Sequence, residues 1–119
     1  MIAGIGIDSI EIARVEKAMA REAFLKRIFT ENERAYLKEK GMAAQSAAAM
    51  FCAKEAVLKA VGLGITDVPL KDIEVLHEES GAPYLKLHGR LGKETGKFFL
   101  SITHTREYAS AFTVWEREE

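Results

Sequence analysis

The sequence predicts an α+β fold in which an antiparallel sheet packs on helices, because strand patterns flank a long helical region. A short apolar run with two glycines, Ile2–Ile7, opens the chain. Helix-forming residues dominate residues 10–61, and two hairpin patterns follow within residues 73–115. We therefore expect one strand before the helices and the remaining strands after them.

The amino-terminal part is expected to begin with a strand and continue as helices. Ile2–Ile7 is typical of a buried strand, because it is apolar throughout and is bounded by polar residues. A helical pattern follows from about Ile10 to Ala20 and continues in pieces to Phe29. Thr30 and Glu33 have the spacing of a capping box, which predicts a short helix that ends before Gly41.

The central helix is the longest predicted element. From Met42 to Val61 nearly every residue favours a helix, and Gly62 follows where a C-terminal glycine belongs. Alanine is the most frequent residue of this segment and is joined by a few bulky apolar residues, which predicts packing on several sides.

The carboxy-terminal part is expected to be two hairpins. The first consists of Ile73–Glu78 and Tyr84–His88 around a turn at Ser80–Pro83. A short helix is expected within Gly89–Gly96, and the β-branched and aromatic residues of Phe98–Trp115 predict the second hairpin.

Composition limits the classes of protein that fit. A chain of 119 residues is expected to form one domain over residues 1–119. Its 17 basic and 18 acidic residues nearly cancel, which argues against a nucleic-acid partner. No long apolar run or signal peptide is present, and the single Cys52 excludes an intramolecular disulfide. We therefore expect a cytoplasmic protein without membrane contact.

Glu55 and Lys59 introduce charge into the alanine-rich helix. A buried carboxylate without a partner costs several kcal/mol, so Glu55 needs a cation. Lys59 lies one turn later, in the favoured orientation for a structural ion pair. Alternatively, Glu55 holds a divalent metal while Lys59 neutralises a phosphate beside it. The helix alone leaves both interpretations open.

Asp8 is the second candidate carboxylate. It follows the predicted first strand, and Glu11 stands three residues later. This spacing fits an Asp-x-x-Glu capping box for the next helix. A carboxylate at a strand-to-helix junction is also held rigidly enough to bind a metal, so the local sequence leaves the choice open.

Polar residues gather at the end of the penultimate strand pattern. His104 is flanked by Thr103 and Thr105, and Arg106 follows. A plain hairpin needs only turn formers here, whereas hydroxyl, imidazole and guanidinium groups are suited to phosphate.

Three segments together closely resemble the holo-acyl-carrier-protein synthases. They are Gly6-Ile7-Asp8, Phe51–Ala60, and Ser101–Thr105 with Tyr108-Ala109, and their order and spacing fit that family over essentially the whole chain. The resemblance implies the 4′-phosphopantetheinyl transferase fold and a homotrimer with active sites between protomers. It also implies transfer of 4′-phosphopantetheine from coenzyme A to a serine of acyl carrier protein, with Mg²⁺, leaving adenosine 3′,5′-bisphosphate.

The same resemblance assigns roles to individual residues. Asp8 and Glu55 are expected to bind Mg²⁺, and Lys59 to neutralise a phosphate oxygen. His104 and Thr105 are expected to contact the coenzyme, and either Glu55 or a water molecule takes the serine proton. Gly62 and Gly64 would let the coenzyme approach the backbone, although Gly62 also fits a simple helix cap.

One position departs from the family pattern. Met50 stands where these enzymes usually have an arginine, and Ala49 precedes it where glycine is common. Met50 lies roughly opposite Glu55 on the helix, so the metal ligands are expected to be undisturbed. Arg106 or Lys54 are candidates to replace the missing cation.

A basic stripe on the first predicted helix suggests a partner. Arg14, Lys17 and Arg21 are spaced to share one side. Such a stripe is often only a solvated face, but an acidic acyl carrier protein would be oriented by it, with Arg14 leading the contact.

Two other functions fit part of the pattern. A metal-dependent phosphohydrolase would use the same Asp8 and Glu55 pair with water as acceptor. A binding module without catalysis would keep the partner and lose affinity for the coenzyme at Met50.

Overall fold

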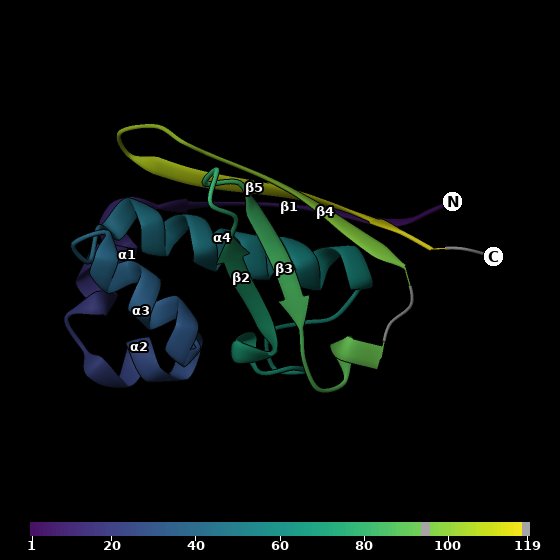
Figure 1. Ribbon diagram of the computed structural model, residues 1–119, viewed down its shortest axis with the longest axis horizontal. Helices are drawn as coiled ribbons and strands as arrows, with labels where there is room; N and C mark the ends of the chain where they lie inside the picture. The colour runs from purple at the N-terminus through teal and green to yellow at the C-terminus, as the bar shows by residue number, and fades with distance from the viewer. Residues whose placement is uncertain (94–95, 118–119) are drawn as a thin grey trace.

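The computed structural model describes residues 1–93 and 96–117, and it confirms the α+β prediction. Within this part of the chain, four α-helices and two short 3₁₀ helices accompany five strands (Figure 1). The helices are α1 (Ile12–Met19), α2 (Glu22–Ile28), α3 (Glu31–Glu39), α4 (Ala44–Val61), η1 (Leu70–Asp72) and η2 (Leu91–Lys93). The strands are β1 (Ile2–Glu11), β2 (Ile73–His77), β3 (Pro83–Leu87), β4 (Lys97–His104) and β5 (Tyr108–Glu116).

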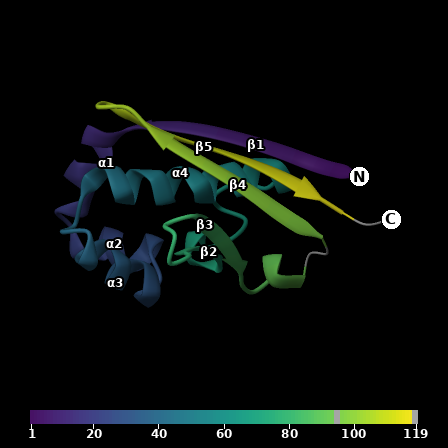
Figure 2. The same ribbon diagram turned by 45° about the horizontal axis from the view of Figure 1, so that its top comes forward.

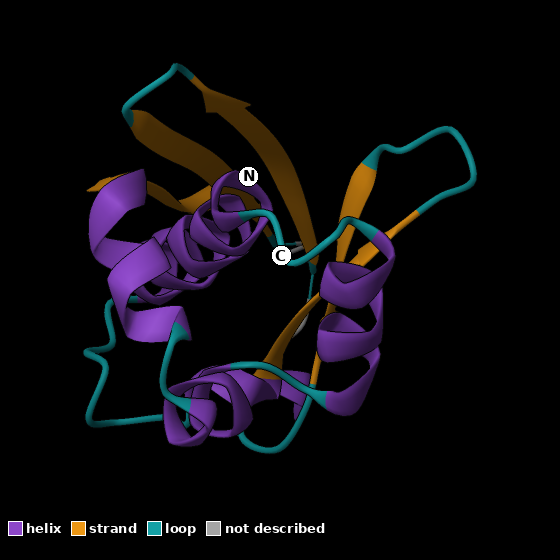
Figure 3. Cartoon of the chain, turned by 90° about the vertical axis from the view of Figure 1, so that its left-hand side faces the viewer, coloured by secondary structure: helices purple, strands orange, loops and turns teal. Residues whose placement is uncertain are grey.

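The strands form two antiparallel sheets rather than one. β5 lies between β1 and β4, so the first strand of the chain pairs with the last, whereas β2 and β3 form a separate hairpin. α4 runs along one face of the three-stranded sheet, as Figure 2 shows, and α1, α2 and α3 gather at one end of the molecule. Seen from that end, the two sheets stand apart with helices between and below them (Figure 3).

α4 packs unusually closely on β1 because β1 offers glycine there. A Cβ atom added to Gly6 would lie 1.8 Å from the carbonyl oxygen of Ala56, and one added to Gly4 would lie 1.9 Å from that of Ala60. No side chain fits into such a gap. The glycines of β1 and the alanines of α4 therefore let the two backbones touch, which fixes the helix against the strand that carries Asp8.

The prediction for β1 was wrong in two respects. The strand continues to Glu11 rather than ending at Ile7, because β5 supplies pairing partners as far as Tyr108. Its outward face is also exposed, with Ile5 and Ile7 about three-fifths accessible.

The Asp8–Glu11 capping box is absent as a consequence. Asp8 lies inside the strand, and the N-cap of α1 is Glu11, which makes no side-chain capping bond. The amide of Ile12 instead donates to the carbonyl of Glu107 at 2.8 Å. α1 therefore begins two residues after the predicted start at Ile10.

Most other predicted boundaries agree with the structure. Thr30 and Glu33 form the expected capping box at the start of α3, and Gly62 ends α4 with a φ of 75°. The first hairpin pairs Ile73 with Leu87 through to His77 with Pro83. The helix expected within Gly89–Gly96 is the short η2, while residues 94–95 lie outside the described part.

The outer face of the three-stranded sheet remains apolar and exposed. Strand alternation places Ile5 and Ile7 of β1 beside Val114 and Phe112 of β5, with Phe99 on β4. Ile5, Ile7, Phe99 and Phe112 are each at least two-fifths accessible. Among residues 1–93 and 96–117, no helix is long and apolar enough to cross a membrane.

Candidate active site

Asp8 and Lys59 meet at the contact between β1 and α4. Asp8 faces inward, since it shares a strand face with Gly6, and its side chain is 18% accessible. The ammonium of Lys59 donates to the carbonyl of Ile7 at 2.9 Å and lies 3.3 Å from Oδ1 of Asp8. More than half of the Lys59 side chain is accessible. Lys59 is therefore anchored through its ammonium, while more than half of its side chain stays open to solvent.

Glu55 stands on the same side of α4, one turn before Lys59. Within the described residues, Lys59 forms its ion pair with Asp8 and not with Glu55. The structural ion pair between Glu55 and Lys59, which their spacing on the helix allowed, is therefore not formed. Burial raises the pKa of Glu55, and the nearby charge of Asp8 raises it further, while Lys59 opposes both effects. The ammonium of Lys59 thus pairs with one of the two carboxylates and acts on the other only through its charge, which leaves the negative charge only partly compensated.

Cys52 closes the inner side of this group. It is fully buried, and its thiol donates to the carbonyl of Ala109 at 3.4 Å. Burial, followed by the charge of Asp8, raises the pKa of the thiol to about 12. Cys52 is therefore a neutral packing residue.

The donor set of this group fits a hard divalent cation. Magnesium is usually bound by one or two carboxylates, with phosphate oxygens and water completing its coordination. Asp8 and Glu55 supply that number, and the described residues contain no cluster of three or more His, Cys, Asp or Glu side chains. Burial and then the charge of Asp8 raise the pKa of Glu55, and a bound cation would act in the opposite direction by favouring the ionised carboxylate.

The glycines after α4 have structural explanations. The amide of Gly62 donates to the carbonyls of Leu58 and Lys59, which is the usual end of a helix. The amide of Gly64 donates to Oδ2 of Asp67 at 2.6 Å. A Cβ on Gly62 would meet nothing within 4 Å, so its positive φ explains this glycine. A coenzyme contact at Gly62 or Gly64 stays a prediction.

His104 and Thr105 lie away from the two carboxylates. In the sheet, Asp8 is level with Ala111 and Ile102, so His104 is two strands away and two residues further along. Standard strand spacings put the Cα atoms of Asp8 and His104 on the order of 12 Å apart. Thr105 closes the β4–β5 turn, since its hydroxyl accepts from the amide of Tyr108 at 3.1 Å.

His104 instead lines a separate cavity of about 280 Å³. Met50 forms part of this cavity, together with Tyr36 and His77, whose rings stack with centroids 3.9 Å apart. Nothing in the sequence pointed to this stack, because the two residues come from different elements, α3 and β2. None of the metal-ligand candidates lines the cavity.

Neither suggested replacement for the missing arginine reaches this cavity. Lys54 is completely buried in an ion pair with Glu33, so it is unavailable to a phosphate. Arg106 lines a different groove, beside Glu11, Glu16 and Glu107. The prediction that Lys54 compensates for Met50 was therefore wrong.

The basic stripe is shorter than predicted. Arg14 and Lys17 lie on α1 and are exposed. Arg21 is also exposed, but α1 ends at Met19 and Arg21 is the N-cap residue of α2. The three side chains therefore belong to a helix and the junction after it, not to one helical face.

Two carboxylates and an accessible lysine lie together where a helix touches a strand, and such a group has the chemistry to hold a divalent ion beside a phosphate. The family model for the 4′-phosphopantetheinyl transferase superfamily matches residues 4–113. The chain belongs to this superfamily.

Named relatives agree with this assignment. The chain is 45% identical over 117 residues to a holo-[acyl-carrier-protein] synthase of Alkaliphilus metalliredigens, covering 93% of this chain and 96% of that protein. It is 44% identical over 121 residues to the Clostridium beijerinckii enzyme of the same name, covering 98% of each. The structure resembles a crystal structure of a holo-(acyl-carrier-protein) synthase from Bacillus anthracis in complex with CoA (3′,5′-ADP), with a TM-score of 0.87, 41% identity and 99% coverage of both chains.

Replacement of Glu55 by glutamine is expected to stabilise the metal-free protein at neutral pH. An acid whose pKa is raised by folding favours its neutral form, so ionised Glu55 lowers the free energy of unfolding above that pKa. In urea unfolding at pH 7.5, Glu55→Gln should be modestly more stable than the wild type. The difference should shrink as the pH falls below about 4, where carboxylates are neutral in the unfolded chain too.

Exposed Glu79 provides the matched control. Glu79→Gln should leave the urea unfolding midpoint unchanged, both at neutral pH and at the acidic pH where carboxylates are protonated. A Glu55→Gln protein that is less stable than the wild type at pH 7.5 would contradict the crowding of the two carboxylates.

Proposed function

We propose that this protein transfers 4′-phosphopantetheine from coenzyme A to a serine of apo acyl carrier protein, leaving adenosine 3′,5′-bisphosphate. The observation that carries the proposal is the convergence of Asp8, Glu55 and Lys59 in a chain of the phosphopantetheinyl transferase superfamily. Relatives named holo-[acyl-carrier-protein] synthase over nearly the full chain support the choice of acceptor. A structure from Helicobacter pylori, described as in complex with coenzyme A, supports the donor (TM-score 0.83, 30% identity, 94% of this chain and 99% of that chain covered).

The chemical step exchanges a phosphoanhydride bond of coenzyme A for a phosphodiester bond to serine. The serine oxygen forms a bond to the phosphorus next to pantetheine, and the bond from that phosphorus to the diphosphate bridge breaks. The bridging oxygen leaves with the electron pair as part of adenosine 3′,5′-bisphosphate. Because negative groups must approach one another, the barrier is largely electrostatic.

Asp8 and Glu55 are the residues that would hold Mg²⁺. When bound, the ion would supply Lewis-acid polarisation of the diphosphate and neutralise charge on the leaving group. Lys59 is half exposed and hydrogen-bonded to the carbonyl of Ile7, so its ammonium can contact a phosphate oxygen without losing its anchor.

Glu55 is also the candidate acceptor of the serine proton, directly or through a water molecule. Burial and the charge of Asp8 raise its pKa, which makes its carboxylate a stronger base than an ordinary surface glutamate. His104 is not assigned as the base, because its place in the sheet separates it from the two carboxylates. We assign His104 and Thr105 to contacts with the nucleotide end of the coenzyme, with Gly62 and Gly64 beside the ligand near Lys59.

We propose that the protein is a homotrimer whose active sites lie between neighbouring protomers. The exposed Ile5, Ile7, Phe99 and Phe112 form an apolar sheet face of the kind that self-association covers. We propose that, in this assembly, the His104 end of one protomer completes the site formed by the carboxylates of another. The buried, free Cys52 is consistent with a cytoplasmic location.

Sedimentation of the purified protein tests the trimer. The expected mass is three times the 13.2 kDa of the chain. Phe112→Lys should reduce it, because a charge on the apolar face opposes burial. A wild-type monomer at micromolar concentration would contradict the assembly.

Arg14 and Lys17, with Arg21 at the α1–α2 junction, are proposed to dock the acidic carrier protein. Arg14→Glu should raise the KM for the carrier about tenfold with little change in kcat, because rim charges steer encounter more than chemistry. Steady-state transfer assays measure both constants. Exposed Arg90, on a distant turn, serves as the control: Arg90→Glu should behave like the wild type, and an unchanged KM in Arg14→Glu would remove Arg14 from the docking surface.

Intact-mass spectrometry of apo carrier protein tests the activity itself. Incubation with this protein, coenzyme A and Mg²⁺ should add one phosphopantetheine to the carrier. The addition should fail with chelator and fall by more than about a hundredfold with Asp8→Ala, which removes a metal ligand. Free phosphopantetheine without carrier modification would identify a phosphohydrolase. Carrier binding that survives Asp8→Ala, with no transfer by the wild type, would identify a binding module.

A further inference from the structure

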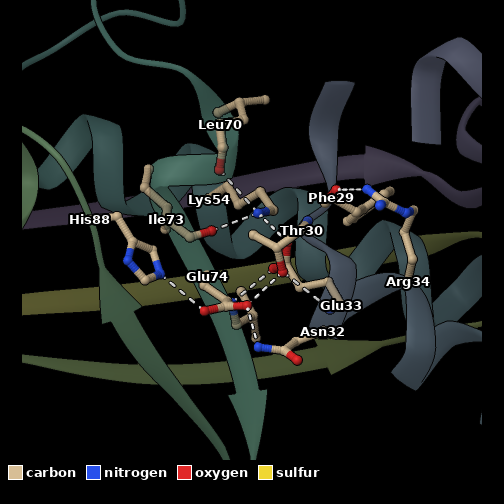
Figure 4. A network of polar contacts seen from close by, with 11 residues as sticks. Phe29, Thr30, Asn32, Glu33, Arg34, Lys54, Leu70, Ile73, Glu74 and His88 are labelled. Atoms are coloured by element: carbon tan, nitrogen blue, oxygen red, sulfur yellow. Dashed lines mark hydrogen bonds and ion pairs between the residues drawn. The ribbon is translucent and has the colours of Figure 1, made fainter. Parts of the chain in front are cut away.

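Lys54 is completely buried in the middle of α4, next in sequence to Glu55. Its ammonium lies 2.8 Å from Oε1 of Glu33, 3.0 Å from the carbonyl of Leu70 and 2.5 Å from that of Ile73 (Figure 4). An ammonium has three protons, and all three are used here. The group therefore joins α4 to α3, through Glu33, and to the segment that enters β2.

Glu33 is held just as completely. Its Oε1 atom accepts from the amide of Thr30 at 2.8 Å, and its Oε2 atom accepts from the amide of Val75 at 2.8 Å. Thr30 in turn donates from its hydroxyl to Glu74 at 2.6 Å. The carboxylate of Glu33 is thus held by the start of α3 and by β2. It cannot move with Lys54 if α4 rotates about its own axis.

Lys54 and the β1 contact hold opposite sides of α4. Lys54 precedes Ala56 by two residues, which is about 200° around a helix. Ala56 and Ala60 face Gly6 and Gly4 on β1, so Lys54 points away from that strand. Glu55, about 100° from both neighbours, lies between the two anchored sides.

A small rotation of α4 would disturb the carboxylate pair. A side-chain carboxylate lies roughly 6–7 Å from the helix axis, so a turn of about 20° moves it about 2 Å. Magnesium requires oxygen ligands at 2.0–2.1 Å in near-ideal geometry. The glycine contact sets how close α4 approaches β1, but alanine and glycine surfaces are smooth and restrain rotation weakly. The bond from Lys59 to the carbonyl of Ile7 on this side comes from a long, half-exposed side chain, which can follow a rotation of the helix.

We propose that the buried Lys54–Glu33 pair is a positioning device that fixes the rotation of α4 and so aims Glu55 at the metal shared with Asp8. The inference rests on the proposed function, because it concerns the same metal site. Lys54 touches neither substrate nor metal and acts through Glu55. A buried ion pair is a poor source of stability compared with apolar packing, so orientation is the larger consequence of this one.

The test measures binding of Mn²⁺ alone, by the electron paramagnetic resonance signal of the free ion, on the full chain without coenzyme. The main variant is Glu33→Gln/Lys54→Met, which removes both charges and nearly preserves volume. Circular dichroism and urea unfolding establish that each protein is folded under the binding conditions. We expect the double variant to bind Mn²⁺ about tenfold more weakly than the wild type. Mg²⁺ at high concentration should restore most of its kcat.

Two further variants separate positioning from general destabilisation. Leu91→Ala creates a cavity at a buried residue of η2, away from α4, and should lower the unfolding midpoint while binding Mn²⁺ like the wild type. Glu33→Asp keeps the charge of both partners but shortens the carboxylate side chain by one methylene group. It should weaken Mn²⁺ binding, and it provides the test if the double variant does not fold.

The outcomes distinguish this inference from the proposed function. Folded Glu33 and Lys54 variants with wild-type Mn²⁺ affinity, or an equal loss in Leu91→Ala, would overturn the positioning role. Wild-type protein that binds no Mn²⁺, or binds it equally well after Asp8→Ala, would overturn the metal site and the positioning role with it.

Discussion

The backbone contact between β1 and α4 is the constraint on which the rest of the structure depends. Gly4 and Gly6 leave no room for any side chain against the carbonyls of Ala60 and Ala56. Because of this, the strand that carries Asp8 and the helix that carries Glu55 and Lys59 lie at the shortest separation that backbones allow. At the usual separation of packed layers, about 10 Å, Asp8 would lie farther from both Glu55 and Lys59.

Close approach alone does not orient a helix. The side of α4 facing the sheet presents small residues, and its polar links there come from half-exposed Lys59 and from the weak thiol donor of Cys52. On the opposite side, the ammonium of Lys54 makes three fully buried hydrogen bonds. The two sides are therefore complementary: the glycine contact limits distance, and the hydrogen bonds of Lys54 limit rotation. The stacked Tyr36 and His77 lie in the neighbouring layer, between α3 and β2, and shape the cavity that Met50 and His104 line.

The sequence correctly predicted the features that depend on interactions between residues close together in the chain. The capping box at Thr30, the glycine end of α4 and the register of the first hairpin all involve neighbours within a few residues. The extent of β1 was missed because its last residues are held by β5, nearly a hundred positions away in the chain. The partner of Lys59 was missed for the same reason, since Asp8 is close only after β1 lies on α4. Lys54 is the clearest case: its sequence neighbours resemble those of Lys59, yet one lysine is fully buried and the other is open to solvent.

Glu55 shows why the site is built from a rigid contact. Its carboxylate is partly desolvated beside Asp8, which is unfavourable for the folded chain without a cation. A flexible surface would relieve this repulsion by letting the side chains separate. Here α4 is held on two sides, so the negative charge stays concentrated and can be relieved only by protonation or by a bound cation. The repulsion between the two carboxylates lowers the free energy of unfolding of the ion-free protein, and relief of that repulsion adds to the affinity for the ion. The small residues and the buried lysine that hold α4 are therefore part of the site, like the ligands themselves.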